Sequence, residues 1–444
     1  MQENFEPTTI ILSAGDGKRM QSATPKVLHE VGCQPLIEYV LKLAMIVSPD
    51  TSNTYMVVSK ELKKDKCFRK ISDQYAFKQV VQEKKSGTGD AVKIAYNHIE
   101  GLKDLVLVLY GDTPFIKSAT IYDMLQQIMS GASLSIVAFN AKNPTGYGKI
   151  ISSGTNKVVE IIEERDTSQE QKNISLCNSG VMLVRKEALA SFLEYNNKVI
   201  NGDEFYLTDI VKYNATKEKV CTYVIADEKE VMGVNDRGQL AVAEKYIQKV
   251  IIENIIQEGA TIIKPETSYF AVDIEVSRDV TIYPNVFIGR NTTIMDGAKI
   301  YPFSHIEGVL IEEGAVIGPF ARIRPDTRIG KNSKVGNFVE VKNSTLMKNV
   351  RAGHLSYIGD ATIHDDVNIG AGTVFCNYDG KNKHHSEVGK KSFIGSNTSI
   401  ISPIAIKNKA TVAAGSVITK NVDENDLAIA RSKQINLKNK SKVK

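Results

Sequence analysis

The chain of 444 residues is too long for one ordinary core, because domains usually hold about 100 to 200 residues, and this excludes a single small binding module. Its content of 42% hydrophobic and 24% charged residues excludes a disordered chain. The net charge of +5 comes from an acid-free tail, since removing its six positive charges leaves 5 − 6 = −1, so nucleic-acid binding is not expected. These charges belong to Arg431, Lys433, Lys438, Lys440, Lys442 and Lys444.

Neither a membrane span nor a secretion signal is expected. No run approaches the roughly 18 uninterrupted apolar residues that a span needs, and Met1–Thr9 has neither a basic nor an apolar region. The expected location is therefore the cytoplasm. The 5 cysteines lie far apart without a CxxC pair, so neither a disulfide framework nor a zinc site is expected.

The first predicted strand, Thr8–Leu12, leads directly into the glycine-containing segment Ser13–Met20. Further apolar runs alternate with helix-like stretches, in the order Pro35–Ile46 (helix), Thr54–Ser59, Leu105–Tyr110, Ala119–Met129 (helix) and Ser133–Phe139. This alternation is typical of an α/β domain in which crossover helices connect a parallel sheet. Ligands of such sheets bind beyond the carboxyl ends of the strands.

A helical period of apolar residues from Leu240 to Ile255 predicts a long helix over 237–257. We interpret this helix as a linker between two domains, 1–236 and 258–444. The alternative is a core helix of the first domain.

From Pro265 to Asp426 isoleucine and valine far outnumber leucine, which favours strands over helices. Within this region, β-branched residues recur every six positions in three runs. The runs are Val276, Ile282, Ile288, Ile294, Ile300, Ile306; then Ile317, Ile323, Ile329, Val335, Val341; then Val388, Ile394, Ile400, Ile406, Val412, Ile418. This period is the signature of a hexapeptide β-helix, in which three repeats form one coil and stacked coils bury the recurring side chains.

A β-sandwich is the alternative, and the six-residue register disfavours it. Glycine often follows the inward residue, as at Gly289 and Gly395, and we expect these glycines to form tight turns at the coil corners. The register breaks at 306–317 and again at 376–387. The second break is polar and predicts a projecting loop, the kind of segment in which functional residues concentrate.

Two segments of the first domain suit phosphate chemistry. Gly15-Asp16-Gly17-Lys18-Arg19 places flexible backbone N–H groups and two cations at a strand end, and Lys26 adds another cation. The spacing fits neither an ATPase P-loop nor a dinucleotide fingerprint. Asp112 ends an apolar strand and is a candidate Mg²⁺ ligand, since Mg²⁺ prefers carboxylates and phosphates. The alternative for Asp112 is a helix N-cap.

Leu12–Met20 followed by Pro25–Leu28 resembles the signature of sugar-nucleotide pyrophosphorylases. With a hexapeptide β-helix behind it, the chain from about residue 8 to 432 resembles the bifunctional GlmU family. Other matching segments are Gln82, Gly87-Thr88-Gly89, Tyr110-Gly111-Asp112, Tyr147-Gly148, Glu163, Asn178 and Gly233-Val234-Asn235. The resemblance implies an α/β Rossmann-like nucleotidyltransferase domain followed by a left-handed parallel β-helix. It also implies two activities, N-acetylglucosamine-1-phosphate uridyltransferase and glucosamine-1-phosphate acetyltransferase.

For the first activity the resemblance implies a set of residues around UTP and the sugar. They are Leu12, Ser13, Ala14, Gly15, Lys26, Gln82, Gly87, Thr88, Tyr110, Gly111, Asp112, Gly148, Glu163, Asn178 and Asn235. Gly148, Glu163 and Asn178 would hold the amino sugar, and Asp112 with Asn235 would hold Mg²⁺. Because a sugar phosphate attacks the α-phosphorus of UTP, the reaction needs in-line positioning and neutralisation of anions, which Arg19, Lys26 and the metal would supply. Lys18 departs from the threonine usual in the family.

For the second activity His354 is the candidate base, because histidine titrates near neutral pH. A structural histidine is the alternative. The resemblance implies Arg322, Lys342, Tyr357, Asn368 and Lys383 as ligands of the sugar phosphate, and Ala371, Asn377, Tyr378, Ser396, Ala414 and Arg431 as ligands of acetyl-CoA. His384 and His385 depart from the family pattern and are interpreted as surface residues. The resemblance also implies a homotrimer that shares its acetyl sites between subunits.

The expected function is therefore acetylation of glucosamine-1-phosphate followed by uridylylation of N-acetylglucosamine-1-phosphate, which gives UDP-N-acetylglucosamine and pyrophosphate. One alternative is a nucleotidyltransferase for another sugar-1-phosphate with a structural or regulatory β-helix, against which His354, Lys342 and Tyr357 argue. Another is a non-catalytic scaffold of the same architecture, against which the intact cations and metal ligands of the first domain argue.

Overall fold

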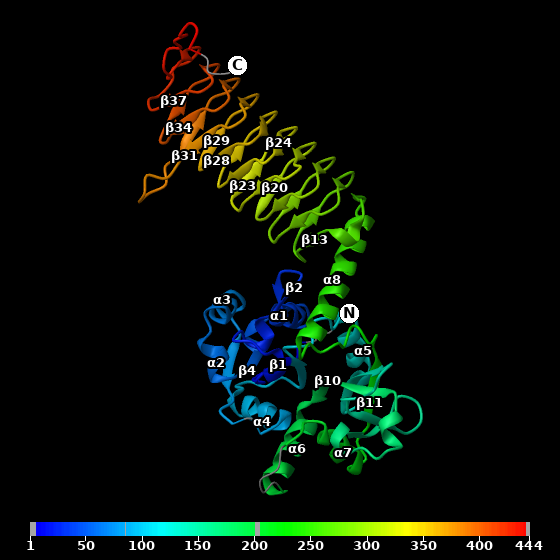
Figure 1. Cartoon of the computed structure of the whole chain (residues 1–444). Coiled ribbons are helices and arrows are strands. Elements are labelled where there is room, and N and C mark those ends of the chain that lie inside the picture. The colour runs from blue at the N-terminus through cyan, green and yellow to red at the C-terminus, as the bar shows by residue number, and fades with distance from the viewer. Residues whose placement is uncertain (1–5, 85, 200–204, 441–444) are drawn as a thin grey trace. The chain divides into compact units, whose positions relative to one another are not determined.

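The computed structural model describes residues 6–84, 86–199 and 205–440, and it divides into two compact units with the boundary after Tyr246. Both are drawn in Figure 1. Lys442 and Lys444 of the basic tail lie outside the described residues. Of the helices that the structure describes, none is long and apolar enough to cross a membrane.

The first unit is built on a sheet with the strand order β11-β7-β10-β6-β1-β4-β5. The strands are β1 (Thr8–Ser13), β4 (Thr54–Val58), β5 (Lys78–Val81), β6 (Leu105–Tyr110), β7 (Leu134–Asn140), β10 (Leu176–Arg185) and β11 (Cys221–Ile225), with β8 (Lys149–Ser152) and β9 (Val158–Ile162) attached to β10 and a separate β2 (Glu30–Val31) and β3 (Gln34–Pro35). The helices are α1 (Leu36–Val47), α2 (Lys60–Lys64), α3 (Lys66–Tyr75), α4 (Thr88–His98), α5 (Ser118–Met129), α6 (Lys186–Val199) and α7 (Asp209–Thr216).

Helices cover both faces of this sheet because its strands are apolar on both sides. Ile11 and Leu107 belong to one buried cluster, with residues of α1, α3 and α5, while Ile10 and Val106 belong to a second, with residues of α4, α6 and α7. Neighbouring residues of a strand point to opposite faces, so the continuous apolar runs of the sequence produce this three-layer α/β domain. The expected α/β class is confirmed.

The main sheet is parallel, as expected, apart from β10. Strands β1, β4, β5 and β6 run parallel, and so do β7 and β11, but β10 lies antiparallel between β6 and β7. The reversal arises because the chain passes through the β8–β9 hairpin before β10, which pairs antiparallel with β8. An apolar run identifies a buried strand but carries no information about its direction.

The long helix predicted over 237–257 is α8 (Arg237–Gln257). The boundary between the two compact units falls inside it. Ala243, in its first half, and Ile251 and Ile255, in its second half, are all buried. The period of apolar residues thus continues along the whole helix.

The second unit is a left-handed parallel β-helix, as expected, and the six-residue register sets its three faces. Inward residues such as Ile282, Ile288 and Ile294 are fully buried, and burial of one such side chain stabilises the fold by about 1.5–3 kcal/mol.

The first face consists of β12 (Thr261–Ile262), β15 (Thr281–Ile282), β18 (Lys299–Ile300), β21 (Val316–Ile317), β24 (Lys334–Asn337), β27 (Arg351–His354), β30 (Asn368–Ile369), β33 (Phe393–Ile394), β36 (Thr411–Val412) and β38 (Leu427–Ala428). The second face consists of β13 (Tyr269–Phe270), β16 (Phe287–Ile288), β19 (His305–Ile306), β22 (Arg322–Ile323), β25 (Glu340–Lys342), β28 (Tyr357–Gly359), β31 (Val374–Cys376), β34 (Ser399–Ile401) and β37 (Val417–Ile418). The third face consists of β14 (Glu275–Val276), β17 (Thr293–Ile294), β20 (Val309–Ile311), β23 (Thr327–Ile329), β26 (Thr345–Leu346), β29 (Ala361–Ile363), β32 (Ser386–Val388) and β35 (Ala405–Ile406).

The role expected for the glycines of the β-helix needs correction. A Cβ atom on Gly336 would lie 1.9 Å from the carbonyl oxygen of Gly353, and one on Gly395 would lie 2.4 Å from the nitrogen of Ala414. Neither glycine has a positive φ angle, whereas corner residues such as Asn291 do. These glycines are therefore needed for the close approach of stacked coils, and other residues form the left-handed corners.

Candidate active sites

The first site is a pocket of about 270 Å³ at the carboxyl ends of β1, β4 and β6. These strand ends meet because Leu12 pairs with Tyr110 and Ser13 pairs with Val58 in the parallel register. The residues that line the pocket are Leu12, Ser13, Ala14, Gly15, Lys26, Val27, Val57, Gln82, Gly87, Thr88, Ala91, Tyr110, Asp112 and Tyr206. Most of the nucleotide residues expected from the sequence are thus brought together in one cavity.

Close contacts require glycine at two positions, Gly87 in the pocket lining and Gly111 beside Tyr110. Gly87 has a φ angle of 105°, and a Cβ atom there would lie 2.2 Å from the carbonyl oxygen of Phe205. A Cβ atom on Gly111 would lie 2.3 Å from Oγ of Ser13, a buried hydroxyl that has no hydrogen-bond partner among the described residues. Gln82 is buried beside them, and its amide donates to Asp90 at 2.9 Å. The walls of the pocket are therefore fixed by close packing.

A charged cluster lies at one side of the pocket. The ammonium of Lys26 pairs with the carboxylate of Asp112 and donates to Oδ1 of Asn235 at 3.0 Å. Gly17 permits this arrangement, because it has a φ angle of 60° and a Cβ atom there would lie 2.8 Å from Cβ of Lys26. Asp112 does not cap a helix, since α5 begins only at Ser118, so that alternative is wrong.

The oxygens of Asp112 and Asn235 fit a Mg²⁺ ion. Both face the same cationic nitrogen, that of Lys26, and a carboxylate with an amide oxygen is a hard donor set that phosphates can complete. No group of three or more His, Cys, Asp or Glu side chains that could hold a metal is found in the described part of the chain. Any cation at this site would therefore depend on the substrate for further ligands.

The phosphate loop, as we call the segment Gly15–Arg19 that is expected to bind phosphate, lies beside this cluster. A second cavity, of about 170 Å³, is lined in part by Ser13, Gly15, Asp16 and Lys26. Arg19 is exposed on the short 3-10 helix Lys18–Met20 and does not line either cavity. The structure therefore places Lys26 in the site, whereas Arg19 lies at the protein surface.

The three residues expected around the amino sugar lie next to one another. The backbone nitrogen of Asn178 donates to the carbonyl oxygen of Gly148 at 2.9 Å, and a Cβ atom on Gly148 would lie 3.6 Å from Oε2 of Glu163. The other carboxylate oxygen of Glu163 accepts a hydrogen bond of 2.7 Å from Thr208. Arg165 of the following turn lies over the ring of Tyr206, which lines the nucleotide pocket. This group therefore adjoins that pocket through Tyr206.

In the β-helix, four of the expected ligands surround a carboxylate that the sequence did not single out, Asp360. Asn377 donates to Asp360 and, at 3.5 Å, to the phenol oxygen of Tyr357, and the ammonium of Lys342 lies 3.9 Å from Asp360. Contact with Lys383 and burial lower the pKa of Lys342, although Asp360 opposes them. Asp360 is 6% exposed and therefore forms the buried centre of this cluster.

The pKa of Asp360 lies below its ordinary value. Burial acts to raise this pKa, but hydrogen bonds from Asn343 and Asn377, together with the charges of Lys342 and Lys383, outweigh burial. Asp360 thus remains a carboxylate and offsets the positive charges of Lys342 and Lys383.

The polar insertion forms a compact loop at this cluster. Tyr378 and Lys383 form an isolated β-bridge, and Tyr378 donates from its phenol to the carbonyl oxygen of Gly380 at 2.6 Å. His384 lies at the surface of this loop, where its ring contacts the Asp379 carboxylate at 2.6 Å and its side chain is 33% exposed. Hydrogen bonds to the backbone of the same loop and to His384 lower the pKa of Asp379. His385 is exposed, as expected.

His354 ends β27 at the corner between the first and second faces and is exposed. Its Nδ1 contacts Oδ1 of Asn337, the residue with which it pairs on the preceding coil. An amide oxygen only accepts, so this contact favours the tautomer with the proton on Nδ1 and leaves Nε2 as an acceptor. That is the state a general base requires.

Four of the six residues expected around acetyl-CoA follow the same corner from coil to coil, namely Ala371, Ser396, Ala414 and Arg431, whereas Asn377 and Tyr378 lie at the Asp360 cluster and in its loop. Asn397, next to Ser396, donates to the carbonyl oxygen of Ala371 at 2.7 Å, and Gly415, next to Ala414, donates to that of Ser396 at 2.8 Å. Arg431 donates from its guanidinium to the carbonyl oxygen of Ala414. The corner thus presents a continuous column that begins at His354.

Two expected ligands lie apart from these groups within one chain. Arg322, on the second face, pairs with Glu340, which in turn pairs with Tyr357, so Arg322 lies two coils before the cluster. Asn368 lies on the first face, between Arg351 and Phe393.

Comparison with known proteins assigns the chain to a family. A family model described as nucleotidyl transferase matches residues 8–241, one described as the GMPPB C-terminal domain matches 305–378, and one described as the hexapeptide repeat of succinyl-transferase matches 387–420. The bifunctional protein GlmU of Zymomonas mobilis subsp. mobilis is 40% identical over 431 residues, which cover 97% of this chain and 95% of the relative. That of Wolbachia pipientis wMel is 41% identical and covers 96% of this chain and 97% of the relative.

The chain belongs to the GlmU family. The expectation of a bifunctional transferase is thereby confirmed, and the single-function and scaffold alternatives are not favoured. Among solved structures, the inositol-1-phosphate CTP transferase from T. maritima matches 54% of this chain and 94% of its own, at 15% identity and a TM-score of 0.42. That likeness is too distant to bear on the site.

Asn337 and Asp360 are two residues of the β-helix that the sequence did not single out. Each lies 17 residues from a partner that was expected, Asn337 from His354 and Asp360 from Asn377. This separation of one coil could have identified both residues from the sequence, because residues at equivalent positions of successive coils stack on one another.

Proposed function

We propose that the chain acetylates glucosamine-1-phosphate with acetyl-CoA at the β-helix and then transfers UMP from UTP to N-acetylglucosamine-1-phosphate in the first unit. The product is UDP-N-acetylglucosamine, a precursor for envelope polymers that maintain cell shape. The observation that carries the proposal is the separation of two groups of residues, one around Lys26 and Asp112 in the first unit, and one in the β-helix that comprises the Asp360 cluster and the corner with His354. The test is whether each activity is lost separately when its own site is altered.

In the uridylyl-transfer site, the chain mainly positions the two substrates and neutralises their negative charge. The sugar-phosphate oxygen attacks the α-phosphorus of UTP while pyrophosphate leaves, so negative charge accumulates where Lys26 and the phosphate loop lie. Lys26, paired with Asp112 and Asn235 in this structure, is held at the pocket and would exchange these partners for phosphate oxygens. Gly148, Glu163 and Asn178 would orient the sugar.

We include Mg²⁺ in the proposal, with Asp112 and Asn235 as the residues that would hold it. When bound, the ion would neutralise phosphate charge. A cytoplasmic location is also part of the proposal, and it rests on the co-substrates, UTP and acetyl-CoA, that the two reactions consume.

In the acetyl-transfer site, His354 would accept the proton that the amine loses as it attacks the thioester carbonyl. The bond between nitrogen and the acetyl carbon forms, the bond between that carbon and sulfur breaks, and coenzyme A leaves as the thiolate. Lys342 and Lys383 would pair with the sugar phosphate. The column of Ala371, Ser396 and Ala414 would support acetyl-CoA.

A homotrimer is part of the proposal. Four large apolar side chains lie exposed in line at the corner that carries His354, and three of them stack with ring centroids 4.9 and 5.1 Å apart. They are Phe303, Phe320, Phe338 and Leu355. An exposed apolar column of this kind favours burial against another subunit. A second subunit at this corner would also bring further residues to His354.

Replacement of the central ring, Phe320→Glu, should therefore break the trimer and lower acetyl transfer with it. A charge placed in an apolar interface would have to be buried without a partner. Sedimentation should show a smaller species, and uridylyl transfer should persist. The control is Met129→Glu, which alters an exposed side chain of α5. A trimer that survives Phe320→Glu would contradict the proposed interface.

Asp360→Asn should raise the KM for glucosamine-1-phosphate about tenfold, because Lys342 and Lys383 would lose the carboxylate that offsets their mutual repulsion and holds them in place. It should also change acid stability. A carboxyl whose pKa is lowered by folding stabilises the fold above its unfolded pKa, about 3.9, and this contribution disappears as the pH falls through the folded value. The variant should thus show a weaker loss of Tm below about pH 4.

The matched control for this prediction is Asp423→Asn, which removes an exposed ion pair with Lys407. It should leave both KM and the acid dependence of Tm unchanged. An Asp360→Asn variant with the KM of the unaltered chain would refute the organising role of Asp360.

A further inference from the structure

Lys149 carries a buried charge that the proposed chemistry does not use. Its side chain is 0% exposed, although it begins β8 directly after Gly148. Lysine is almost never fully buried unless it is paired, because the desolvated ammonium must be compensated by partners. The partners of Lys149 therefore indicate what its burial achieves.

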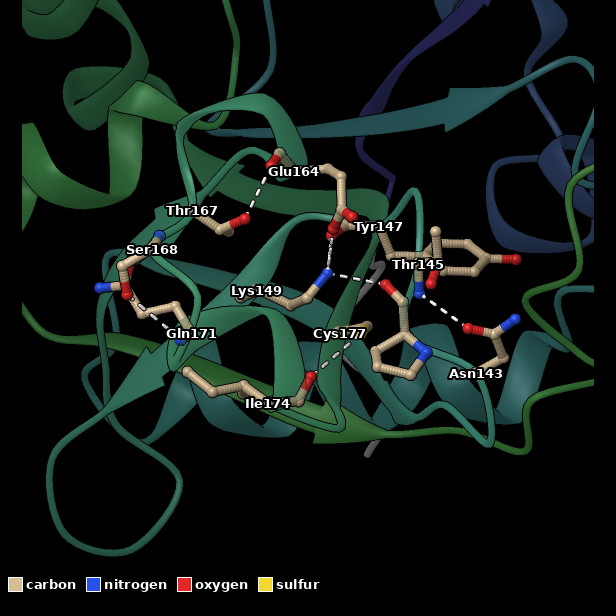
Figure 2. A network of polar contacts seen from close by, with 11 residues as sticks. Asn143, Thr145, Tyr147, Lys149, Glu164, Thr167, Ser168, Gln171, Ile174 and Cys177 are labelled. Atoms are coloured by element: carbon tan, nitrogen blue, oxygen red, sulfur yellow. Dashed lines mark hydrogen bonds and ion pairs between the residues drawn. The ribbon is translucent and has the colours of Figure 1, made fainter.

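The ammonium of Lys149 has three acceptors, which match its three hydrogens. It donates to the carbonyl oxygens of Pro144 and Tyr147 at 2.7 and 2.6 Å, and to the carboxylate of Glu164 at 2.5 Å. Figure 2 shows the ammonium directed at Glu164, between the loop before β8 and the turn after β9. The hydrogen bond from Lys149 lowers the pKa of Glu164, so this partner stays ionised. Lys149 thus joins the loop before β8 to the turn after β9, and a backbone hydrogen bond from Gly146 to Glu164 links the same two segments.

These two segments carry the residues proposed around the sugar. Gly148 precedes Lys149 in the chain and accepts from Asn178 at 2.9 Å, while Glu163 precedes Glu164. The carboxylate of Glu163 lies 3.6 Å from where a Cβ atom of Gly148 would be. A shift of either segment would change the spacing of all three sugar ligands.

The turn held by Lys149 also reaches the nucleotide pocket. Its middle residue, Arg165, lies 4.6 Å from the centroid of the ring of Tyr206, and Tyr206 lines that pocket. Arg165 reaches that pocket through Tyr206, whereas Gly148 and Glu163 are themselves the residues proposed around the sugar. An effect on the sugar is therefore expected before an effect on UTP.

We propose that Lys149 is a positioning residue for sugar recognition, whose enclosed ammonium fixes Gly148 and Glu163 at the spacing that an N-acetylated sugar-1-phosphate requires. The proposal rests on the proposed uridylyl transfer. Lys149 does not touch the substrate, since its three acceptors enclose it. Removal of its charge would take one donor from each of two carbonyl groups and one carboxylate, and the segments would move to replace these hydrogen bonds.

The test is Lys149→Met, which keeps the length of the side chain and removes the charge. The KM for N-acetylglucosamine-1-phosphate should rise about tenfold, the loss expected when buried acceptors are left unpaired, and the KM for UTP should stay within about twofold. Lys149→Arg, which retains the charge and donors, should restore part of the sugar affinity. Acetyl transfer by the same chain should be unchanged, and the KM for UTP serves as the folding control for the first unit.

The matched control is Lys212→Met, which removes the exposed ion pair of Lys212 with Glu160 on β9 and should alter neither KM. If Lys149→Met does not fold, Glu164→Gln weakens the same contact from the other side and should give the same selective rise. A folded variant with an unchanged sugar KM, or with equal rises for the sugar and UTP, would overturn the proposal. Absence of uridylyl transfer in the unaltered chain would instead contradict the proposed function.

Discussion

His354→Ala is expected to lower acetyl transfer by about 100- to 10,000-fold, the range that a positioned general base contributes, and to leave uridylyl transfer unchanged. The reason is local, since His354 lies at a corner of the β-helix where its Nδ1 contacts Asn337 and its Nε2 is left to accept a proton. The measurement is release of the coenzyme A thiol with glucosamine-1-phosphate and acetyl-CoA.

The matched control is His364→Ala, because His364 lies on the same β-helix in an ion pair with Glu387. It should keep both activities. Asn337→Ala should lower acetyl transfer less than His354→Ala does, since it removes the residue that orients the ring and not the base itself. Loss of both activities in His354→Ala would contradict the two-site account, and full acetyl transfer would leave His354 a structural residue.

Asp112→Ala should affect the other activity. It should lower Mg²⁺-dependent pyrophosphate release by about 100- to 1,000-fold, the usual cost of removing one preorganised electrostatic group. Asp112 pairs with Lys26 at the pocket, and Asn235 shares that lysine. The variant would lose both the carboxylate proposed for the metal and the group that holds Lys26. Acetyl transfer should stay unchanged, because its residues belong to the β-helix.

The control for Asp112 is Glu83→Gln, which removes the charge of an exposed carboxylate paired with Lys60 in the same unit. It should release pyrophosphate at the rate of the unaltered chain. Unchanged Mg²⁺-dependent release in Asp112→Ala would refute the metal role of Asp112. A loss that additional Mg²⁺ reverses would support that role.

The β-helix was predictable from the sequence because its signal is local. One β-branched residue in six, as at Ile288 and Ile294, must point inward, and this requirement repeats in every coil. The direction of β10 was not predictable in the same way, since it depends on the β8–β9 hairpin that precedes it. Strand direction is a property of the topology and not of the apolar pattern.

The site residues likewise fall into those that the sequence predicted and those that it missed. Residues on one strand end or loop, such as Gly15 and Lys26, were accessible to sequence reasoning because the motif itself places them together. Asp360 and Lys149 were missed because their importance arises from partners in other segments, Asn377 for the first and Glu164 for the second. A buried charge reveals itself only when its neighbours are known.

One assay tests the central claim most directly. The purified protein is supplied with glucosamine-1-phosphate, acetyl-CoA, UTP and Mg²⁺, and free thiol and pyrophosphate are followed together. The account predicts thiol release with glucosamine-1-phosphate and acetyl-CoA, and pyrophosphate release only when acetylation has taken place. Pyrophosphate release without thiol release would contradict it, because the β-helix would then have no acetyltransferase activity.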